Sequence, residues 1–214
     1  MIIKLSKNTY VAEGRHREIH LHPSENNLVV KIRRQKANSA SHKPFKRLMY
    51  KWIPSTLYRG FLNEIKLELK TKILESTTGI KSPIAATQGL INTNLGLGML
   101  MQRIGPKQKV IGKTLQDFAD AKTLTPEKIK ALNETAHALF EFKIVCSDLN
   151  SCNFVWSDIE ERFLLVDGFG DRNLFKVRTL FTVLRNKKLN EGLTKTGAAS
   201  GLVWSTTQRQ FTRA

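Results

Sequence analysis

Short segments rich in β-branched residues, separated by turn-forming clusters, occupy the start of this chain. Residues 10–12, 19–21 and 28–32 have strand-like composition, and residues 23–27 (Pro-Ser-Glu-Asn-Asn) are typical of a turn. Three short strands joined by short turns predict an antiparallel meander. We therefore expect the N-terminal end of the protein to be a sheet whose strands follow one another in sequence.

Helical periodicity follows this sheet. Apolar residues recur at steps of three and four over residues 61–74, which predicts one helix. They are Leu62, Ile65, Leu69 and Ile73. Two more strands are expected at residues 84–86 and 97–104. Before the helix, residues 33–51 are basic and contain no Asp or Glu, and we expect them to form a loop.

The second half of the chain has a mostly helical pattern. A short helix is expected at residues 115–121, and a longer one opens at Thr125-Pro126 with a threonine cap and a proline in the first position. The longer helix has an apolar face formed by Ile129, Leu132, Ala136, Leu139 and Phe140.

A hairpin and a basic tail complete the pattern. Two short strands are expected at residues 153–156 and 162–166. The tail from Leu174 onward predicts a basic helix, and the small polar residues beyond Gly192 are expected to be frayed.

The chain carries a large excess of positive charge. Lys and Arg number 35 against 18 Asp and Glu, which gives a formal net charge of +17 at pH 7. This balance favours an anionic partner, which could be a nucleotide, a nucleic acid, a phosphorylated substrate or a membrane surface. An ordinary solvated surface also explains the charge, and the sparse aromatic residues give little support to a base-stacking surface.

The apolar content indicates a folded protein without a transmembrane segment. Hydrophobic residues make up 41% of the chain, which excludes a disordered protein. The longest nearly unbroken apolar run, residues 95–101, is far shorter than the roughly 20 residues that a membrane span needs. Since no secretory signal is evident, we expect a cytoplasmic protein whose charge could also hold it at the inner membrane surface.

The two cysteines, Cys146 and Cys152, exclude a disulfide framework and a four-cysteine zinc site. Their spacing differs from Cys-x-x-Cys, so nothing indicates a redox role. We expect both to be small core or loop residues.

One ordered set of polar residues carries the strongest functional signal. A strand lysine comes first, and two glutamates one turn apart on a helix follow it. An Asp and an Asn then stand five residues apart, and a second Asp comes shortly before Phe-Gly. These residues are Lys31, Glu64, Glu68, Asp148, Asn153 and Asp167. The same parts in the same order are typical of protein-kinase-like phosphotransferases.

Phosphoryl transfer requires a triphosphate held in line and its charge neutralised, with little covalent chemistry from the protein. Lys31, on a rigid strand, can reach the α- and β-phosphates, and a helix glutamate can fix its position. Asp148 can accept or orient the proton of the attacking hydroxyl. Asn153 and Asp167 offer the oxygen ligands that Mg²⁺ prefers. The set therefore predicts ATP and Mg²⁺ as cofactors.

Two segments match kinase signatures only in part. Residues 148–153 have the Asp-Leu-x-x-x-Asn pattern of a catalytic loop, but Val145-Cys146-Ser147 lacks the usual His-Arg. Asp167-Gly168-Phe169-Gly170 has one residue more than Asp-Phe-Gly. Only Gly14 stands where a kinase has several loop glycines. The C-terminal lobe is therefore expected to be reduced and its catalytic loop atypical.

The chain also resembles the YrbL family of PhoP regulatory network proteins, which are small bacterial kinase-like proteins. The resemblance is carried by short segments: Gly14–Arg17, His20–Pro23, Val30–Ile32, Glu64–Lys70 and the Asp167-x-Phe-Gly region. It implies a small kinase-like fold with Lys31, Glu68 and Asp167 at the ATP-site positions. It also favours Glu68 over Glu64 as the partner of Lys31.

Together these features predict a two-lobed α+β protein of the kinase-like type. An N-terminal nucleotide-binding lobe of residues 1–103 is expected to hold an antiparallel sheet and one helix. A reduced, mostly helical lobe with the catalytic loop is expected over residues 104–214. Gly14 is expected at the phosphates, and the strand end from Met101 to Arg103 is expected to supply backbone hydrogen bonds to adenine.

Three functions are compatible with this sequence. The first is a phosphotransferase that uses ATP and Mg²⁺ on a phosphosugar, an envelope glycolipid or a protein acceptor. The second is a pseudokinase-type regulatory module that binds nucleotide or a partner without turnover. The third is a basic nucleic-acid-binding protein. Ordinary roles also stay open, such as a solvated Lys31, a surface pair between Glu68 and Lys72, and turn capping by the loop Asp and Asn.

Overall fold

The computed structural model describes residues 2–14, 17–34, 52–107, 109–169 and 182–213. Most of the loop expected at residues 33–51 lies outside these ranges, as do Gly170 and the first part of the expected basic tail.

The chain divides into two compact units. The first unit comprises Met1–Lys66 and Ala86–Arg103, and the second comprises Leu67–Ala85 and Ile104–Ala214. The fold is α+β, with an N-terminal antiparallel sheet, as expected. None of the helices in the described ranges has both the length and the apolar composition needed to cross a bilayer.

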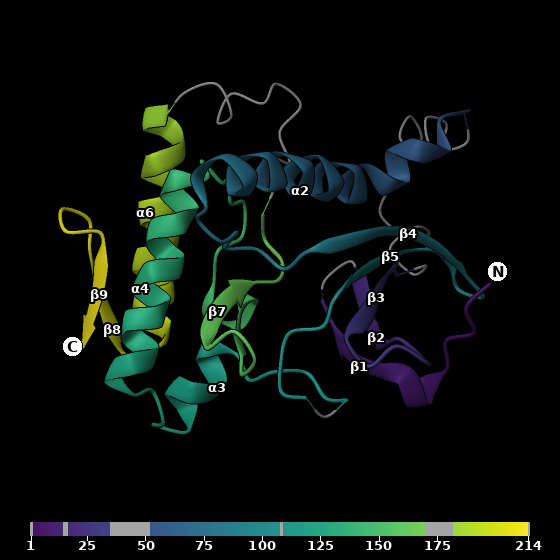
Figure 1. The fold of residues 1–214 in the computed structure, drawn as a ribbon, viewed down its shortest axis with the longest axis horizontal. Coiled ribbons are helices and arrows are strands. Elements are labelled where there is room, and N and C mark those ends of the chain that lie inside the picture. Colours follow the sequence, from purple (N-terminus) through teal and green to yellow (C-terminus); the bar gives the residue numbers. More distant parts are fainter. Residues whose placement is uncertain (1, 15–16, 35–51, 108, 170–181, 214) are drawn as a thin grey trace. The chain divides into compact units, whose positions relative to one another are not determined.

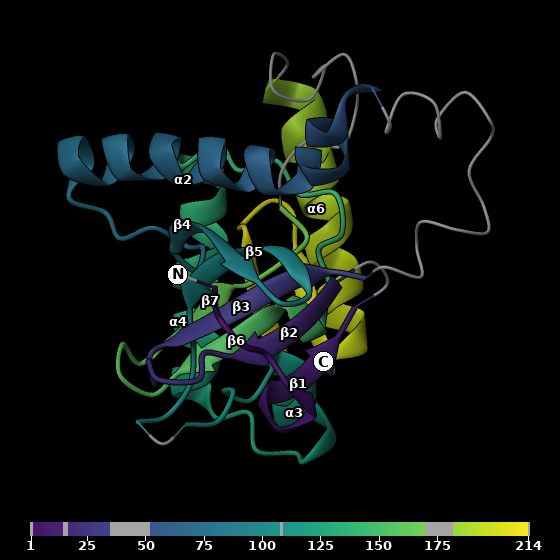
Figure 2. The same cartoon turned by 90° about the vertical axis from the view of Figure 1, so that its right-hand side faces the viewer.

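The first unit contains a five-stranded antiparallel sheet (Figure 1; Figure 2). Its strands, in order across the sheet, are β1 (Tyr10–Glu13), β2 (Arg17–Leu21), β3 (Leu28–Arg33), β5 (Gly96–Gln102) and β4 (Thr87–Thr93). The expected meander is confirmed as β1, β2 and β3. The strand expected at residues 84–86 is wrong, because β4 begins at Thr87 and Ile84 instead forms a bridge to Leu165 within the second unit.

The central strand β3 is buried on both faces. Val30 and Ile32 point into the apolar core of the first unit, together with Ile3 and Leu5. Because successive side chains of a strand point to opposite faces, Lys31 lies on the other face. That charged side chain is also buried, so it requires a partner.

Helix α2 (Arg59–Thr78) confirms the helix expected after the loop. Its apolar stripe is nevertheless not its buried face. Three of the four stripe residues are between 41% and 63% exposed, namely Leu62, Leu69 and Ile73, and Ile65 is half-buried. The buried side chains are instead Phe61, Glu64 and Thr71. The buried face includes the Glu64 carboxylate because Glu64 pairs with cations of the sheet. Such a pairing cannot be recognised from the periodicity of apolar residues.

Two helices of the second unit begin at the capping residues that the sequence shows. α3 (Leu115–Asp120) and α4 (Pro126–Glu141) start after Thr114 and Thr125, whose side chains accept backbone hydrogen bonds. The apolar face expected for α4 is buried: Ile129, Leu132, Ala136, Leu139 and Phe140. The expected hairpin is also present, as β6 (Phe154–Ser157) and β7 (Arg162–Leu165).

The C-terminal part of the chain is more ordered than its composition predicts. Three elements form it: α6 (Thr182–Ala199), β8 (Leu202–Ser205) and β9 (Gln210–Arg213). The expectation of fraying beyond Gly192 is therefore wrong. The Trp204 ring stacks on Phe140 of α4 at 6.4 Å between centroids and contacts Phe211 at 4.7 Å. Burial of these rings stabilises the hairpin of β8 and β9. The small polar residues around it gave no indication of this hairpin in the sequence.

Asn133 of α4 forms two hydrogen bonds to the backbone of strand β9. Its Oδ1 accepts a hydrogen bond from the Phe211 N–H at 2.6 Å, and its Nδ2 donates to the Phe211 carbonyl at 3.1 Å. One side chain thus satisfies both backbone groups of a strand residue.

We expect Asn133→Ala to lower the free energy of unfolding by about 2 kcal/mol, because two backbone groups lose their partners. Urea unfolding measures this change. Lys130→Ala, at an exposed position of the same helix, is the control and is expected to change the free energy by less than about 0.5 kcal/mol. Equal stability of the two variants would contradict the prediction.

Candidate functional site

Lys31 and Glu64 form a buried ion pair in the first unit. Lys31 lies on β3 and Glu64 on the first turns of α2, and their side chains are only 3% and 2% exposed. Nζ of Lys31 is 3.6 Å from Oε2 of Glu64. Arg17 of β2 contacts the other carboxylate oxygen, Oε1. One carboxylate therefore contacts two cations, and these charge contacts help to hold the three side chains in place.

The strand register explains why Arg17 joins this group. Ile19 pairs with Lys31 across β2 and β3, and Arg17 stands two residues before Ile19, so it lies on the same face of the sheet. Its guanidinium also lies 5.3 Å from the centroid of the Phe61 ring. Arg17 was not among the site residues predicted from the sequence. Arg17 lies two residues before Ile19, which pairs with Lys31, and this spacing is the sequence signal that could have indicated Arg17.

The structure shows an ion pair between Lys31 and Glu64, whereas the family resemblance favoured Glu68. We expected Glu68, but the structure pairs Lys31 with Glu64, one helical turn earlier. Glu68 is half-buried and belongs to the part of α2 that is counted with the second unit. Both glutamates have suitable chemistry, so only the position of the helix against the sheet decides between them.

In the second unit, backbone hydrogen bonds join the catalytic-loop segment to the Asp-Gly-Phe segment. The Asp148 N–H donates to the Gly168 carbonyl at 3.1 Å. The Val166 N–H donates to the Asn153 carbonyl at 2.9 Å. Asp148, Asn153 and Asp167, which the sequence predicts as one functional group, are therefore brought together.

Gly168 is the point at which the two segments touch. Its φ is +82°, a left-handed conformation that favours glycine. A Cβ at this position would lie 2.8 Å from the Asp148 carbonyl carbon, closer still to its oxygen, and 2.9 Å from Asn153 Nδ2. The residue that lengthens Asp-Phe-Gly to Asp-Gly-Phe-Gly is thus the one that permits this approach.

The side chains of this group suit a divalent cation with oxygen ligands. Asn153 Nδ2 donates to the Asp148 carbonyl at 2.8 Å, which fixes the amide. Its Oδ1 has no hydrogen-bond partner in the described part of the chain. Asp167 is half-buried, and its Oδ1 accepts the Gly168 N–H at 2.8 Å. Asp148 is exposed, and its Oδ1 accepts a hydrogen bond from Asn150 Nδ2 at 3.3 Å.

Few protein side chains are needed to hold Mg²⁺ at this place. Among the described residues, no group of three or more His, Cys, Asp and Glu side chains could hold a metal. Mg²⁺ does not require such a group, because it is usually held by one or two carboxylates and takes its other ligands from water and substrate phosphates.

Two of the residues expected to contact a nucleotide lie in the first unit. Gly14 follows β1, its N–H donates to the Arg17 carbonyl at 2.8 Å, and a Cβ there would meet nothing within 4 Å. Met101 is buried in β5, between β3 and β4. Their roles toward a nucleotide stay predictions.

Arg103 is engaged within the protein. Its backbone N–H donates to the Asn27 carbonyl at 2.7 Å, and its Nε donates to the Asn26 carbonyl. Burial lowers the pKa of its guanidinium. The backbone N–H that we expected to bind adenine is therefore already used within the protein.

Cys146, next to the catalytic-loop segment, is a core residue of the second unit. Cys146 is buried, and burial raises the pKa of its thiol to about 12. The thiol is therefore neutral at physiological pH, in agreement with a core role. Cys152 is exposed.

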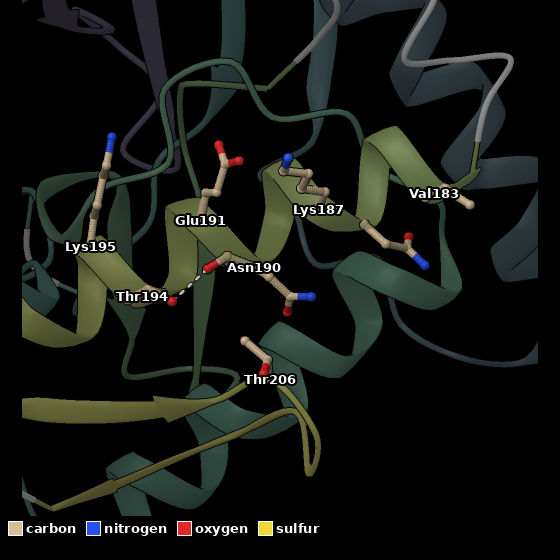
Figure 3. A pocket seen from close by; sticks show the side chains of 8 residues that line it. Val183, Lys187, Asn190, Glu191, Thr194, Lys195 and Thr206 are labelled. Atoms are coloured by element: carbon tan, nitrogen blue, oxygen red, sulfur yellow. Dashed lines mark hydrogen bonds between the residues drawn. The ribbon is translucent and has the colours of Figure 1, made fainter.

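A shallow groove of about 740 Å³ lies along α6 in the second unit (Figure 3). Residues of α6 between Val183 and Lys195 line it, together with Thr206 in the connection from β8 to β9. Among the described residues, none of the predicted site residues lines this groove. It is therefore separate from the candidate site.

The sequence matches a family model over most of its length. The model is described as PhoP regulatory network protein YrbL, and it matches residues 3–198. The chain belongs to this family. The match confirms the family resemblance inferred from the short segments. No curated protein matches the chain. The YrbL family description names a regulatory network and states no reaction or cofactor.

We expect Glu64→Gln to lower the free energy of unfolding by about 3 kcal/mol, because two buried cations lose the carboxylate that compensates them. Lys31→Met is expected to lower it by less than about 1 kcal/mol, since Glu64 keeps Arg17 as a partner. Urea unfolding at pH 7 measures both. Glu13→Gln is the control, because Glu13 pairs with Arg34 at the surface. A Glu64→Gln variant no less stable than this control would contradict the prediction.

Gly168→Ala is expected to destabilise the protein by about 3 kcal/mol, since it adds a steric clash with the Asp148 carbonyl to the cost of a left-handed alanine. Gly201→Ala is the matched control: Gly201 has a φ of +70°, and a Cβ added there would meet nothing within 4 Å. It should cost only about 1 kcal/mol. Thermal unfolding of both variants compares them, and equal losses would show that the contact at Gly168 is unimportant.

Proposed function

We propose that this YrbL-family protein is a kinase-like phosphotransferase that uses ATP and Mg²⁺. The observation that carries the proposal is the convergence of Asp148, Asn153 and Asp167 through the contact at Gly168. Two carboxylates and a carboxamide whose oxygen is without a hydrogen-bond partner in the described ranges form a set that metal-assisted phosphoryl transfer requires.

Each residue has a role in this proposal. Asn153 Oδ1 and the Asp167 carboxylate would hold Mg²⁺, which neutralises phosphate charge when it is bound. Asp148 is exposed and would orient the acceptor hydroxyl and take its proton. Lys31 would bind the phosphates, with Glu64 in the positioning role that we first gave to Glu68. Arg17 contacts the same carboxylate, so a second cation lies beside Glu64 in addition to Lys31.

The acceptor is proposed from charge alone. The net charge of +17 favours an acidic acceptor, such as a phosphosugar or an envelope glycolipid, over a neutral one. A protein acceptor is the other candidate. A cytoplasmic location, with charge-driven association with the inner membrane surface, belongs to the same proposal.

A pseudokinase-type regulatory module is the second candidate function. Val145-Cys146-Ser147 stands where a protein kinase has His-Arg, and the family description refers to a regulatory network. Such a module would bind nucleotide or a partner protein without turnover. Nucleic-acid binding is supported only by the positive charge, and steep salt dependence with no response to ATP would identify it.

We expect ATP with Mg²⁺ to raise the melting temperature of the wild-type protein. Lys31→Met should weaken ATP binding about tenfold or more, because a phosphate contact is lost. Asp167→Asn should remove the magnesium-dependent part of the stabilisation. Asp158→Asn, in the exposed turn between β6 and β7, is the matched control and should behave like the wild type.

Turnover separates the two main candidates. ADP formation from ATP over a panel of acceptors should be measurable for the wild type and at least about 100-fold slower for Asp148→Asn, since the proton acceptor is lost. ATP binding without ADP formation, autophosphorylation included, would select the pseudokinase. The absence of any response to ATP and Mg²⁺ would overturn both.

A further inference from the structure

Lys70 lies within electrostatic range of two other cations of the second unit, and no carboxylate pairs with any of the three in the described part of the chain. Lys70 comes from α2, Lys143 follows α4, and Arg185 lies near the start of α6. Lys70 Nζ donates to the Lys143 carbonyl oxygen at 3.4 Å. Burial lowers the pKa of the Lys70 ammonium, and the positive charges of Arg185 and Lys143 lower it further. Within the described ranges, none of the three forms an ion pair.

Arg185 is the most constrained member of this cluster. Only 5% of the residue is exposed, and its Nε is buried without a hydrogen-bond partner. Burial lowers the pKa of its guanidinium. A buried guanidinium that no carboxylate compensates is costly, so its presence in a folded unit calls for an anion. Buried charges in proteins are otherwise paired or bound to a ligand.

We propose that Lys70, Lys143 and Arg185 form a binding site for the phosphate group of a small phosphorylated molecule. A guanidinium matches the geometry of phosphate oxygens through two parallel N–H groups, and Lys70 and Lys143 add positive charge to the same region. Three cations also favour a doubly charged phosphate over a singly charged carboxylate.

The site is distinct from the metal-binding group proposed above. Gly192 of α6 packs against Leu149, so closely that a Cβ added to the glycine would lie 2.8 Å from the Leu149 side chain. Arg185 stands seven residues earlier on the same helix, which places it about 10 Å along the helix axis from this contact. The groove of Figure 3 lies on α6 as well, but neither Arg185 nor the two lysines line it.

Inorganic phosphate, without ATP or Mg²⁺, is the probe for this site. Titrated against chloride at constant ionic strength, phosphate should raise the melting temperature of the wild-type protein to a plateau. Arg185→Met should abolish this response. In phosphate-free buffer the same variant should melt no lower than the wild type, since it removes an uncompensated buried charge.

Two lysine variants keep the proposal testable if Arg185→Met does not fold. Lys70→Met and Lys143→Met should each weaken phosphate binding about tenfold. Lys187→Met removes an exposed cation from the same helix and should bind phosphate like the wild type. No saturable phosphate response in the wild type, or equal losses in Lys187→Met and Lys70→Met, would overturn the site. Because no nucleotide is present, failure here would leave the proposed phosphotransferase activity unaffected.

Discussion

The removal of charged side chains from water is costly unless they are paired with opposite charges. The two units differ in how their buried cations are paired. In the first unit, Glu64 pairs with both Lys31 and Arg17, so one carboxylate links a helix to two strands. In the second unit, Arg185 is buried without any such partner among the described residues. In the function that we propose, Lys31 would bind nucleotide phosphates, and Arg185 would bind a separate phosphate group.

Close contact between two backbone segments brings Asp148, Asn153 and Asp167 together in the second unit. The turn at Gly168 lets the loop of Asp148 and Asn153 hydrogen-bond to the segment that carries Asp167. Any side chain at Gly168 would push these segments apart. The short hairpin of β6 and β7 brings the two segments back to each other along the chain, so local geometry accounts for the convergence.

Much of the fold could be predicted from the sequence because its signals are local. Turn clusters indicated β1 to β3, and the threonine caps indicated α3 and α4. The groups of the second unit, Asp148, Asn153 and Asp167, were also predictable, since their spacing along the chain reflects one hairpin. The site was predicted less well in the first unit, where Arg17 was missed and Glu68 was preferred. Those contacts depend on strand register and on the placement of α2.

By itself, the sequence determined the α+β class, the order of most elements up to β7, the family and the residue types suited to phosphate chemistry. Only the tertiary structure decided that α2 buries Glu64 and leaves Leu69 exposed, and that Trp204 orders the C-terminal hairpin. The physical reason is that periodicity and capping are properties of neighbouring residues. Ion pairs and ring stacking instead join residues far apart in the chain, and they form only when the elements pack.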